Sequence, residues 1–313
     1  MLWLYILLGV LGFLLLTAFC ATLVCYLTCF YHSNKAKKPD DVTPVKGPKT
    51  DKFETSSVIN AALAIPCEKV YIKSHDGLKL YGRYYKGEEG KPISLQFNGY
   101  KGNGIRDMAG GLAFSLELGY SVMCVDQRAH GYSEGNTISF GIKERYDVLD
   151  WIKYILERFG NNTKIVLQGI SMGAATVLMA ADLDLPENVV AIIADCPYCS
   201  PFEIVAKVTA VDLKLPWKII KPFMLLGARL FGHFNLKESS ALESVKSAKV
   251  PILIIHGDDD DFVPLEMSER VQKVKPELVT LVPVHGAPHG LSFVVDNALY
   301  RNSVIDFYKN HNI

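Results

Sequence analysis

The first apolar stretch of the chain is far longer than the later ones and carries no charge. Leu2 to Tyr31 contains no Asp, Glu, Lys or Arg. As a helix rising about 1.5 Å per residue it would reach roughly 45 Å, whereas the hydrocarbon core of a bilayer is about 30 Å thick. A cleaved signal peptide is the alternative, but the segment lacks a basic start and a small-residue cleavage site. The pattern therefore predicts a single-pass transmembrane anchor over residues 1–31.

A polar segment follows the predicted anchor. Residues 32–66 are rich in Lys, Asp, Pro and Thr and predict a linker, with a short helix around Ser57 to Ala64. Lys35, Lys37 and Lys38 stand directly after the apolar run. The positive-inside rule therefore favours a cytoplasmic position for the rest of the chain, with an extracytoplasmic position as the alternative.

The remaining residues, 67–313, show the pattern of one α/β domain. Lys69 to Lys73 and Leu78 to Tyr85 alternate in polarity about the turn His75-Asp76-Gly77, which predicts an antiparallel hairpin. A helical pattern over Gly141 to Phe159 lies among later runs that are mostly continuously apolar, as in buried parallel strands. These runs are Ile93–Phe97, Ser121–Val125, Lys164–Gln168, Val189–Ala194, Pro251–His256 and Leu278–Val284. We expect an eight-stranded, mostly parallel sheet with helices on both faces.

Composition narrows the classes of function. Acidic and basic residues are equally numerous, 33 each, which argues against a nucleic-acid partner. Three of the seven cysteines fall within the predicted anchor. Cys196 and Cys199 form a C-x-x-C pair after an apolar run, which is the local context of a thiol-disulfide motif. A pocket-lining loop that happens to hold two thiols is the alternative interpretation.

The segment Gly169-Ile170-Ser171-Met172-Gly173 is the main candidate for chemistry. It stands where the strand ending at Gln168 must turn into a helix beginning at Ala174, and a Ser on such a turn is exposed as a nucleophile. The five-residue pattern alone is weak. An acid, Asp260, and then a His, His289, follow in the chain order that acyl-transfer sites of this architecture use.

In several segments the chain resembles the α/β-hydrolase superfamily, and the resemblance covers residues 67–313. Asn98-Gly99-Tyr100 is similar to the His-Gly-x turn after the third strand. The stretch from Asp126 to Gly135 resembles D-x-R-G-H-G-x-S-x-G, and that from His256 to Pro264 resembles H-G-D-x-D-x-x-V-P. Pro288-His289-Gly290 stands where the family places its catalytic His. Among relatives, the chain looks most like bacterial membrane-anchored members near the serine aminopeptidase and monoacylglycerol-lipase-like branch.

The resemblance assigns roles to three side chains. Ser171 is the nucleophile, His289 its base, and Asp260 the acid that orients the imidazole. His285 is an alternative base four residues away. Asp260 lies in a run of four, so a slip in the turn would exchange it with a neighbour; Asp258 is expected to stabilise the turn, and Asp259 and Asp261 to be solvated.

Backbone groups complete the expected site. The N–H groups of Met172 and Tyr100 would form the oxyanion hole. Asn98 departs from the usual His of the family, which puts the packing of that loop in doubt more than the catalysis. His130 and Asp126 are expected to satisfy a sharp loop and not to be catalytic.

An insertion over residues 201–249 stands where the family carries its cap. Pro216 and Pro222 are expected to break it into short helices. Its apolar residues alternate with lysines and arginine, which fits either a small lid packed on the domain or a lid that admits acyl chains or touches the bilayer.

The sequence thus predicts a membrane-anchored serine hydrolase that cleaves a carboxylic ester, with a small-molecule ester or short peptide as substrate. Peptide or amide hydrolysis by the same residues is the second hypothesis. A thiol-disulfide protein that uses Cys196 and Cys199, or a non-catalytic binding protein on the same fold, are the alternatives from other classes. No cofactor is implied, and no metal-ligand cluster was recognised.

Overall fold

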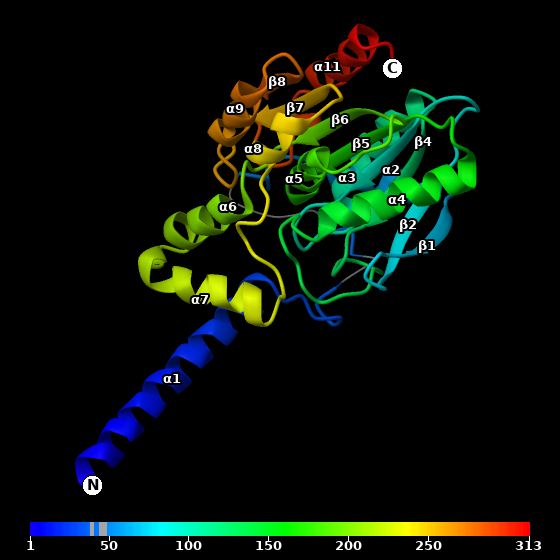
Figure 1. The fold of residues 1–313 in the computed structure, drawn as a ribbon. Helices are drawn as coiled ribbons and strands as arrows, with labels where there is room; N and C mark the ends of the chain where they lie inside the picture. Colours follow the sequence, from blue (N-terminus) through cyan, green and yellow to red (C-terminus); the bar gives the residue numbers. More distant parts are fainter. Residues whose placement is uncertain (38–40, 44–48) are drawn as a thin grey trace.

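The computed structural model describes residues 1–37, 41–43 and 49–313. Its centre is one sheet of eight strands in the order β1-β2-β4-β3-β5-β6-β7-β8 (Figure 1). β1 and β2 pair antiparallel, as do β2 and β4, and all other pairs are parallel. The expected eight-stranded, mostly parallel sheet is therefore confirmed. The strands are β1 Glu68–Lys73, β2 Lys79–Tyr85, β3 Ile93–Phe97, β4 Ser121–Asp126, β5 Ile165–Ile170, β6 Val189–Asp195, β7 Ile252–Gly257 and β8 Val279–Val284.

Helices cover both faces of the sheet (Figure 1). The α-helices of the described residues are α1 Leu2–Cys29, α2 Ser56–Ala64, α3 Gly104–Glu117, α4 Glu144–Phe159, α5 Met172–Met179, α6 Pro201–Lys207, α7 Trp217–Leu230, α8 Ala241–Ser244, α9 Leu265–Val274, α10 Ser292–Val295 and α11 Asn297–Asn310. The helix expected from Gly141 begins three residues later because the Glu144 carboxylate accepts hydrogen bonds from the N–H groups of Ser139 and Gly141, which holds those residues in a turn.

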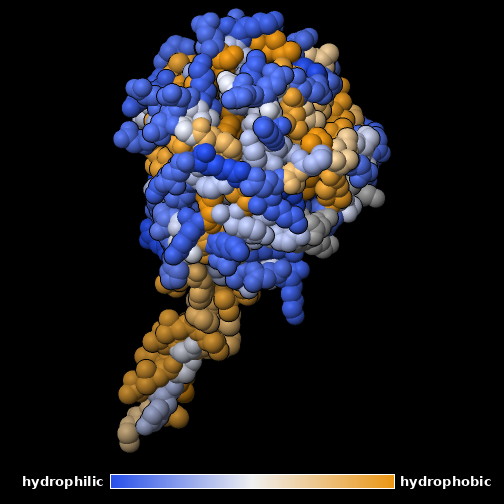
Figure 2. Space-filling model, turned by 90° about the vertical axis from the view of Figure 1, so that its right-hand side faces the viewer, coloured by the Kyte–Doolittle hydropathy of each residue, from blue (hydrophilic) through white to orange (hydrophobic). Residues whose placement is uncertain are grey.

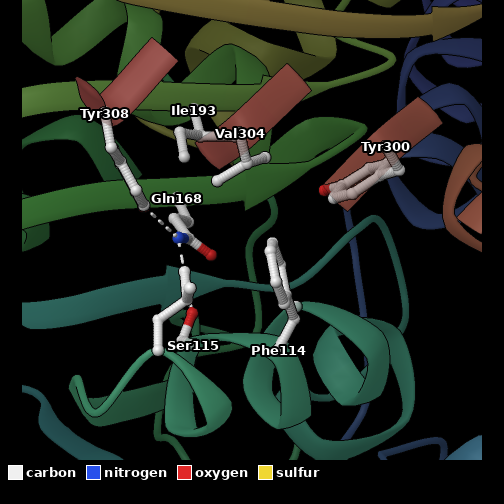
Figure 3. Close-up of a pocket in the computed structure, with 9 residues that line it drawn as sticks. Phe114, Ser115, Gln168, Ile193, Tyr300, Val304 and Tyr308 are labelled. Carbon is white, nitrogen blue, oxygen red and sulfur yellow. Dashed lines mark hydrogen bonds between the residues drawn. The ribbon is translucent and has the colours of Figure 1, made fainter. Parts of the chain in front are cut away.

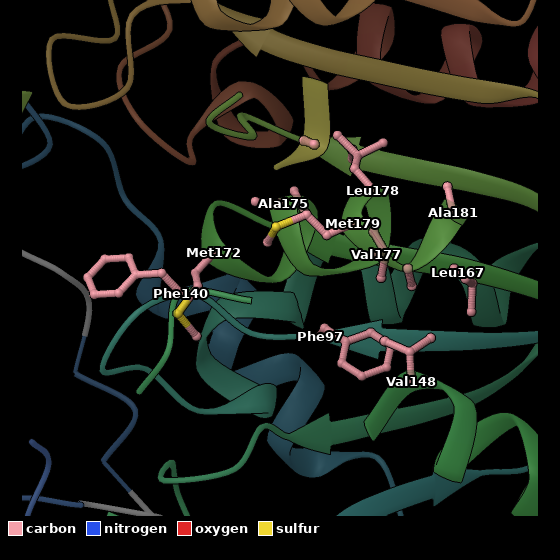
Figure 4. Close-up of a cluster of buried hydrophobic side chains, with 14 of the residues drawn as sticks. Phe97, Phe140, Val148, Leu167, Met172, Ala175, Val177, Leu178, Met179 and Ala181 are labelled. Atoms are coloured by element: carbon pink, nitrogen blue, oxygen red, sulfur yellow. The ribbon is translucent and has the colours of Figure 1, made fainter. Parts of the chain in front are cut away.

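The alternation of side chains along each strand divides the core into two layers. On β5, Ile165 and Leu167 join a cluster that includes Trp151 of α4 and the apolar residues of α5 (Figure 4). Val166, between them, joins the opposite cluster with Phe114 of α3. Each buried strand therefore supplies apolar side chains to both faces, which is why its sequence is continuously apolar.

One buried polar group interrupts the layer between α3 and α11. Gln168 of β5 accepts a hydrogen bond from Gln96 Nε2 at 3.0 Å, and its own Nε2 donates to Tyr308 Oη at 3.3 Å. Ser115 of α3 lies beside the same amide, at the edge of a small cavity (Figure 3). The side chains thus bond to one another inside the apolar layer, with Gln96 Oε1 left without a partner among the described residues.

Helix α1 projects from the body of the molecule, and in Figure 2 its apolar surface contrasts with a mainly hydrophilic body. It is long and apolar enough to cross a membrane. The chain then enters the fold directly: Phe30 is fully buried, with its ring 5.9 Å from that of Phe140 and 5.2 Å from that of Phe234. Tyr31 forms a β-bridge with Thr137. The helix and the domain are therefore joined without a slack connection at this point.

The first residues of the segment interpreted as a linker also lie on the domain. His32 Nδ1 donates to the carbonyl of Ala129 at 2.8 Å. Lys37 Nζ donates to the carbonyls of Ser133 and Gly135, and burial lowers its pKa. Lys38, which entered the orientation argument, lies outside the described residues.

The cap insertion consists of α6, a π-helical turn over Val208–Asp212, α7 and α8. Pro216 stands before α7, but the prediction that Pro222 also ends a helix is wrong, because α7 continues through it. A proline costs the helix one backbone hydrogen bond. The packing of Gly227 and Ala228, both buried, supports α7 beyond that point.

Candidate active site

Ser171 lies on a sharp turn between β5 and α5. Its backbone has φ 54° and ψ −113°, a conformation that non-glycine residues rarely adopt. The flanking glycines make this turn possible. A Cβ at Gly169 would lie 2.3 Å from the carbonyl carbon of Gly173, and one at Gly173 would lie 2.1 Å from the carbonyl oxygen of Phe97. The two glycines of the motif are therefore required by close backbone packing, and the turn holds the Ser171 side chain at the end of the strand.

The structure brings Ser171, His289 and Asp260 together from three distant parts of the chain. His289 Nε2 lies 2.8 Å from Ser171 Oγ, and His289 Nδ1 lies 2.6 Å from Asp260 Oδ2. An ionised carboxylate can only accept, so Nδ1 carries a proton and donates it to Asp260. In the neutral imidazole Nε2 is then an acceptor, directed at the hydroxyl of Ser171. The arrangement can therefore withdraw a proton from that hydroxyl.

Asp260 is buried, yet it is held in its ionised form. Burial alone would raise its pKa, but hydrogen bonds from His256 and His289 and from the backbone N–H of Val263 bring the pKa below its ordinary value. His256 Nε2 also donates to the carbonyl of Val263 at 2.8 Å. The hydrogen bonds from His256 and Val263 thus hold the Asp260 carboxylate in place in addition to its contact with His289.

The neighbours of Asp260 in the acidic turn point elsewhere. Asp258 accepts from the N–H of Gly286 and lies 2.9 Å from His285 Nδ1, so it links the turn to the following loop. Asp259 and Asp261 both contact the ammonium group of Lys49. The His285 side chain is fully exposed and pairs with Asp258, and it is His289 that contacts Ser171.

The loop after β3 lies against Ser171 and carries Tyr100. A Cβ at Gly99 would be 3.6 Å from the Cβ of Ser171. The loop is tied on both sides of Tyr100, because the N–H of Gly99 donates to Asp107 and that of Lys101 donates to His130 Nε2. The N–H of Met172 opens α5 on the other side of Ser171, where a helix N-terminus favours negative charge. The loop that carries Tyr100 and the first turn of α5 thus both adjoin Ser171.

Hydrogen bonds made by Asn98, Asp126 and His130 hold the loop after β3 and the loop after β4 in place. Asn98 accepts from the N–H of Gln127 and donates to the carbonyl of Gly99, so an amide here cross-links two loops. Asp126 accepts from the N–H groups of Gly104 and Tyr132. His130 Nδ1 donates to the carbonyl of Arg128, which leaves Nε2 to accept from Lys101.

Three contacts at the site had no signal in the sequence. The hydroxyl of Tyr100 donates to the carbonyl of Cys29, in the last turn of α1, at 2.8 Å. The ring of Tyr100 stacks on that of Phe140 at 5.1 Å. The ring of Phe262 lies 5.0 Å from that of His289. None of these contacts corresponds to a spacing or a motif, since each joins residues through the tertiary fold alone.

Two groups of described residues are close enough together to share a cation. The first is Cys196, Asp260 and His289, and the second is His75, Asp147 and Asp150. In the first group, burial raises the pKa of the Cys196 thiol well above its ordinary value, and Asp260 and His289 are bonded to each other. In the second, Asp147 already pairs with the guanidinium of Arg128 at 2.5 Å. Both sets of donors are therefore engaged in ways that do not suit a metal ion.

The cysteines of the C-x-x-C pair are both buried and unpaired. Burial raises the pKa of Cys199 to about 12, as it raises that of Cys196. A redox-active cysteine needs a stabilised thiolate and access from solvent. The environment of these two thiols favours neither.

Comparisons with known proteins agree with the fold that carries these residues. Residues 97–217 match the family model described as the α/β hydrolase fold. Protein YqkD of Bacillus subtilis is 30% identical over 63% of this chain, and the match spans 65% of the length of that relative. Among solved structures, the Pyrococcus furiosus esterase Pf2001 superposes with a TM-score of 0.65 at 23% identity, over 85% of this chain and 99% of the esterase chain. The Pyrococcus horikoshii acylaminoacyl peptidase does so with a TM-score of 0.57 at 21% identity, over 82% of this chain and 44% of its own.

Proposed function

We infer that this chain, which belongs to the α/β-hydrolase superfamily, cleaves carboxylic esters through an acyl-enzyme formed on Ser171. The observation that carries the proposal is the continuous pair of contacts from Asp260 through His289 to Ser171, at 2.6 and 2.8 Å. A hydroxyl is a poor nucleophile at neutral pH, and this arrangement provides the base that it requires.

In the proposed reaction, His289 Nε2 accepts the proton of Ser171 as Oγ attacks the ester carbonyl carbon. The carbonyl oxygen becomes an oxyanion beside the N–H groups of Met172 and Tyr100. The tetrahedral intermediate collapses, and His289 returns the proton to the departing alkoxide. Water then attacks the acyl-enzyme with His289 as base, which releases the acid and restores Ser171.

The cap supports a hydrophobic substrate. It presents apolar side chains on α7 and in the segment before it, close to a helix suited to a bilayer. Amide or peptide hydrolysis is the second candidate, because it would use the same three side chains and because the acylaminoacyl peptidase shares the fold. The two differ in the leaving group that His289 must protonate.

We also propose that residues 2–31 hold the protein in a membrane, with the domain on the cytoplasmic side. A signal sequence passes the same test of length and apolarity. A cleavable leader, however, would take with it Tyr26 and Phe30, which are buried in the fold. The packing of this segment therefore favours a retained anchor.

A fluorophosphonate probe tests the proposed nucleophile. The parent is expected to be labelled and Ser171→Ala is not, while Ser303→Ala on α11 serves as the matched control and stays labelled. Equal labelling of the parent and Ser171→Ala would contradict the proposal. Loss of activity on thiol alkylation, without fluorophosphonate labelling, would instead support the C-x-x-C pair.

Substrate class is tested separately, on the parent protein that has not been treated with the probe. We expect p-nitrophenyl esters of increasing chain length to be hydrolysed faster than aminoacyl p-nitroanilides, because the exposed cap is apolar. The opposite order of kcat/KM would favour the peptidase candidate while leaving the role of Ser171 intact.

A further inference from the structure

The cap helix α7 packs directly on the C-terminal half of α1. Gly227 lies so close that a Cβ there would be 2.9 Å from the carbonyl oxygen of Thr22 and 3.3 Å from Tyr26 Cβ. At the end of α7, the ring of Phe231 lies 5.9 Å from that of Phe19 and 5.5 Å from that of Tyr26. The two helices therefore touch over the stretch from Phe19 to Tyr26.

This contact fixes the position of α7 along the normal of any bilayer that α1 crosses. The first buried residue of α1 is Thr22, and the helix before it, from Leu2 to Ala21, spans about 30 Å, the thickness of a hydrocarbon core. Because α7 meets α1 at the end of that stretch, α7 lies at the boundary between hydrocarbon and headgroups. The burial of Phe30 leaves no slack that would let the cap move away.

The surface of α7 suits that location. Ile219, Leu226 and Leu230 are 64%, 43% and 52% exposed, and their spacing of seven and four residues places them along one stripe of the helix. The segment just before α7 adds three more exposed apolar side chains, Val211, Leu213 and Leu215. Exposed apolar residues gathered in this way mark an interaction surface.

The charge of the same segment identifies the partner. From Val211 to Phe231 the chain has four basic residues, Lys214, Lys218, Lys221 and Arg229, and one acidic residue, Asp212, whose carboxylate pairs with Lys207. Apolar side chains combined with lysine and arginine are typical of helices that lie in the interface of a membrane with negatively charged headgroups. Over the whole chain acidic and basic residues are equally numerous, so this bias is local.

We propose that α7 and residues 211–215 dock on an anionic bilayer surface, with the apolar stripe in the acyl boundary and the basic side chains among the phosphates. The inference rests on the membrane insertion proposed above, and it is independent of whether Ser171 is the nucleophile. It implies that the cap meets membrane-dissolved substrates directly.

The fluorescence of Trp217, at the start of α7, provides the test in the full chain. Trp3→Phe removes the tryptophan of α1, and Trp151 is buried and supplies a constant background. In vesicles of phosphatidylcholine with phosphatidylglycerol, brominated acyl chains are expected to quench Trp217 strongly. The Trp3→Phe/Trp217→Phe variant gives the background value for Trp151 alone.

Charged substitutions on the apolar stripe of α7 test whether these side chains insert into the bilayer or merely lie near it. Ile219→Glu together with Leu226→Glu should reduce the quenching of Trp217 by about half or more, since glutamate is repelled by the acyl boundary and by anionic lipid. Leu63→Glu, at a comparably exposed leucine on α2 (46%), is the control and should leave it unchanged.

The outcomes separate the proposals. Quenching no greater than the Trp151 background, in protein that floats with the vesicles, would overturn the docking surface but not the anchor. Protein that fails to float would overturn the anchor and with it this inference. Cross-linking of α7 to α7 without quenching would show that a second copy of the chain occupies the surface, and would also overturn it. Fluorophosphonate labelling reports on the hydrolase in each case.

Discussion

At the scale of single residues, the candidate site depends on where each proton is held. Nδ1 of His289 donates a hydrogen bond to Asp260, so Nε2 is the nitrogen that can accept the proton of Ser171. The sequence predicted these three residues, and the structure brings them together, but the sequence left four adjacent aspartates to choose from. Only the geometry of the turn distinguishes them, because Phe262 and Val263 direct their N–H groups to Asp260 alone.

Asp260→Asn tests this assignment. The amide can donate to Nδ1, which would stabilise the wrong tautomer of His289, so we expect kcat to fall by about a thousandfold or more with little change in KM. Asp258→Asn is the matched control from the same turn, since its side chain contacts His285 and Gly286, and it should keep kcat near that of the parent. An equal loss in both variants would mean that the turn as a whole, and not Asp260, supports activity.

His130 gives the stability of the protein a pH dependence. Burial lowers its pKa from 6.5 to about 3, so the folded state holds the neutral ring more firmly than the unfolded state does. This stability is fully present above the unfolded pKa and is lost as pH falls from 6.5 toward 3. We therefore expect the stability of His130→Gln to fall less than that of the parent as the pH is lowered through this window. The measurement is the denaturation midpoint of both proteins in detergent, taken near neutral pH and again midway between pH 6.5 and 3.

His32 lies beside His130, and burial lowers its pKa in the same direction, so a residual dependence is expected in the variant. Substitution of the exposed His311 provides the comparison and should leave the slope of the parent unchanged. A parent whose stability does not fall on acidification within this window would contradict the argument.

At the scale of elements, continuous apolar runs predicted six strands and alternating polarity predicted the two strands of the hairpin, all to within a few residues. The helices were harder, because their ends depend on contacts that the pattern does not contain. Glu144 delays the start of α4 through its carboxylate, and α7 passes through Pro222 because tertiary packing outweighs one lost hydrogen bond. Hydrophobicity likewise could not show that the last turn of α1 faces protein, since a side chain suited to lipid is equally suited to a core.

Phe30→Ala measures how firmly the end of α1 belongs to the domain. Removal of a buried phenylalanine leaves a cavity, and we expect the free energy of unfolding to fall by about 3 to 5 kcal/mol. Phe13→Ala, at an exposed position on α1, should leave the unfolding of the domain unchanged when both are followed by chemical denaturation in detergent. A small effect of Phe30→Ala would show that the domain folds independently of the anchor.

At the scale of the whole molecule, a long apolar helix and an α/β domain share one continuous core. The pattern of apolar and polar residues predicted both parts, but it separated them by a linker from residue 32, and nothing in the sequence indicated that residues 32–37 contact the domain. The proposed orientation depends on lysines that follow the helix, of which Lys37 is bonded within the fold.

Cys67 provides a native reporter of that orientation. It is exposed, whereas Cys124, Cys196 and Cys199 are buried, and the other cysteines lie in α1. With a cytoplasmic domain, a membrane-impermeant maleimide should label Cys67 only after the cells are opened, and Cys67→Ser should remove that label. Labelling of intact cells would place the domain on the outer side.

The hydrogen bond from Tyr100 to the carbonyl of Cys29 has a mechanical consequence. Helices that are longer or shorter than the surrounding hydrocarbon adjust by tilting. Because the last turn of α1 is bonded to the loop beside Ser171, a change of tilt in a thicker or thinner membrane is transmitted to that loop and is not absorbed by a tether. Turnover in vesicles should therefore vary with the acyl-chain length of the host lipid, and Tyr100→Phe should weaken that dependence.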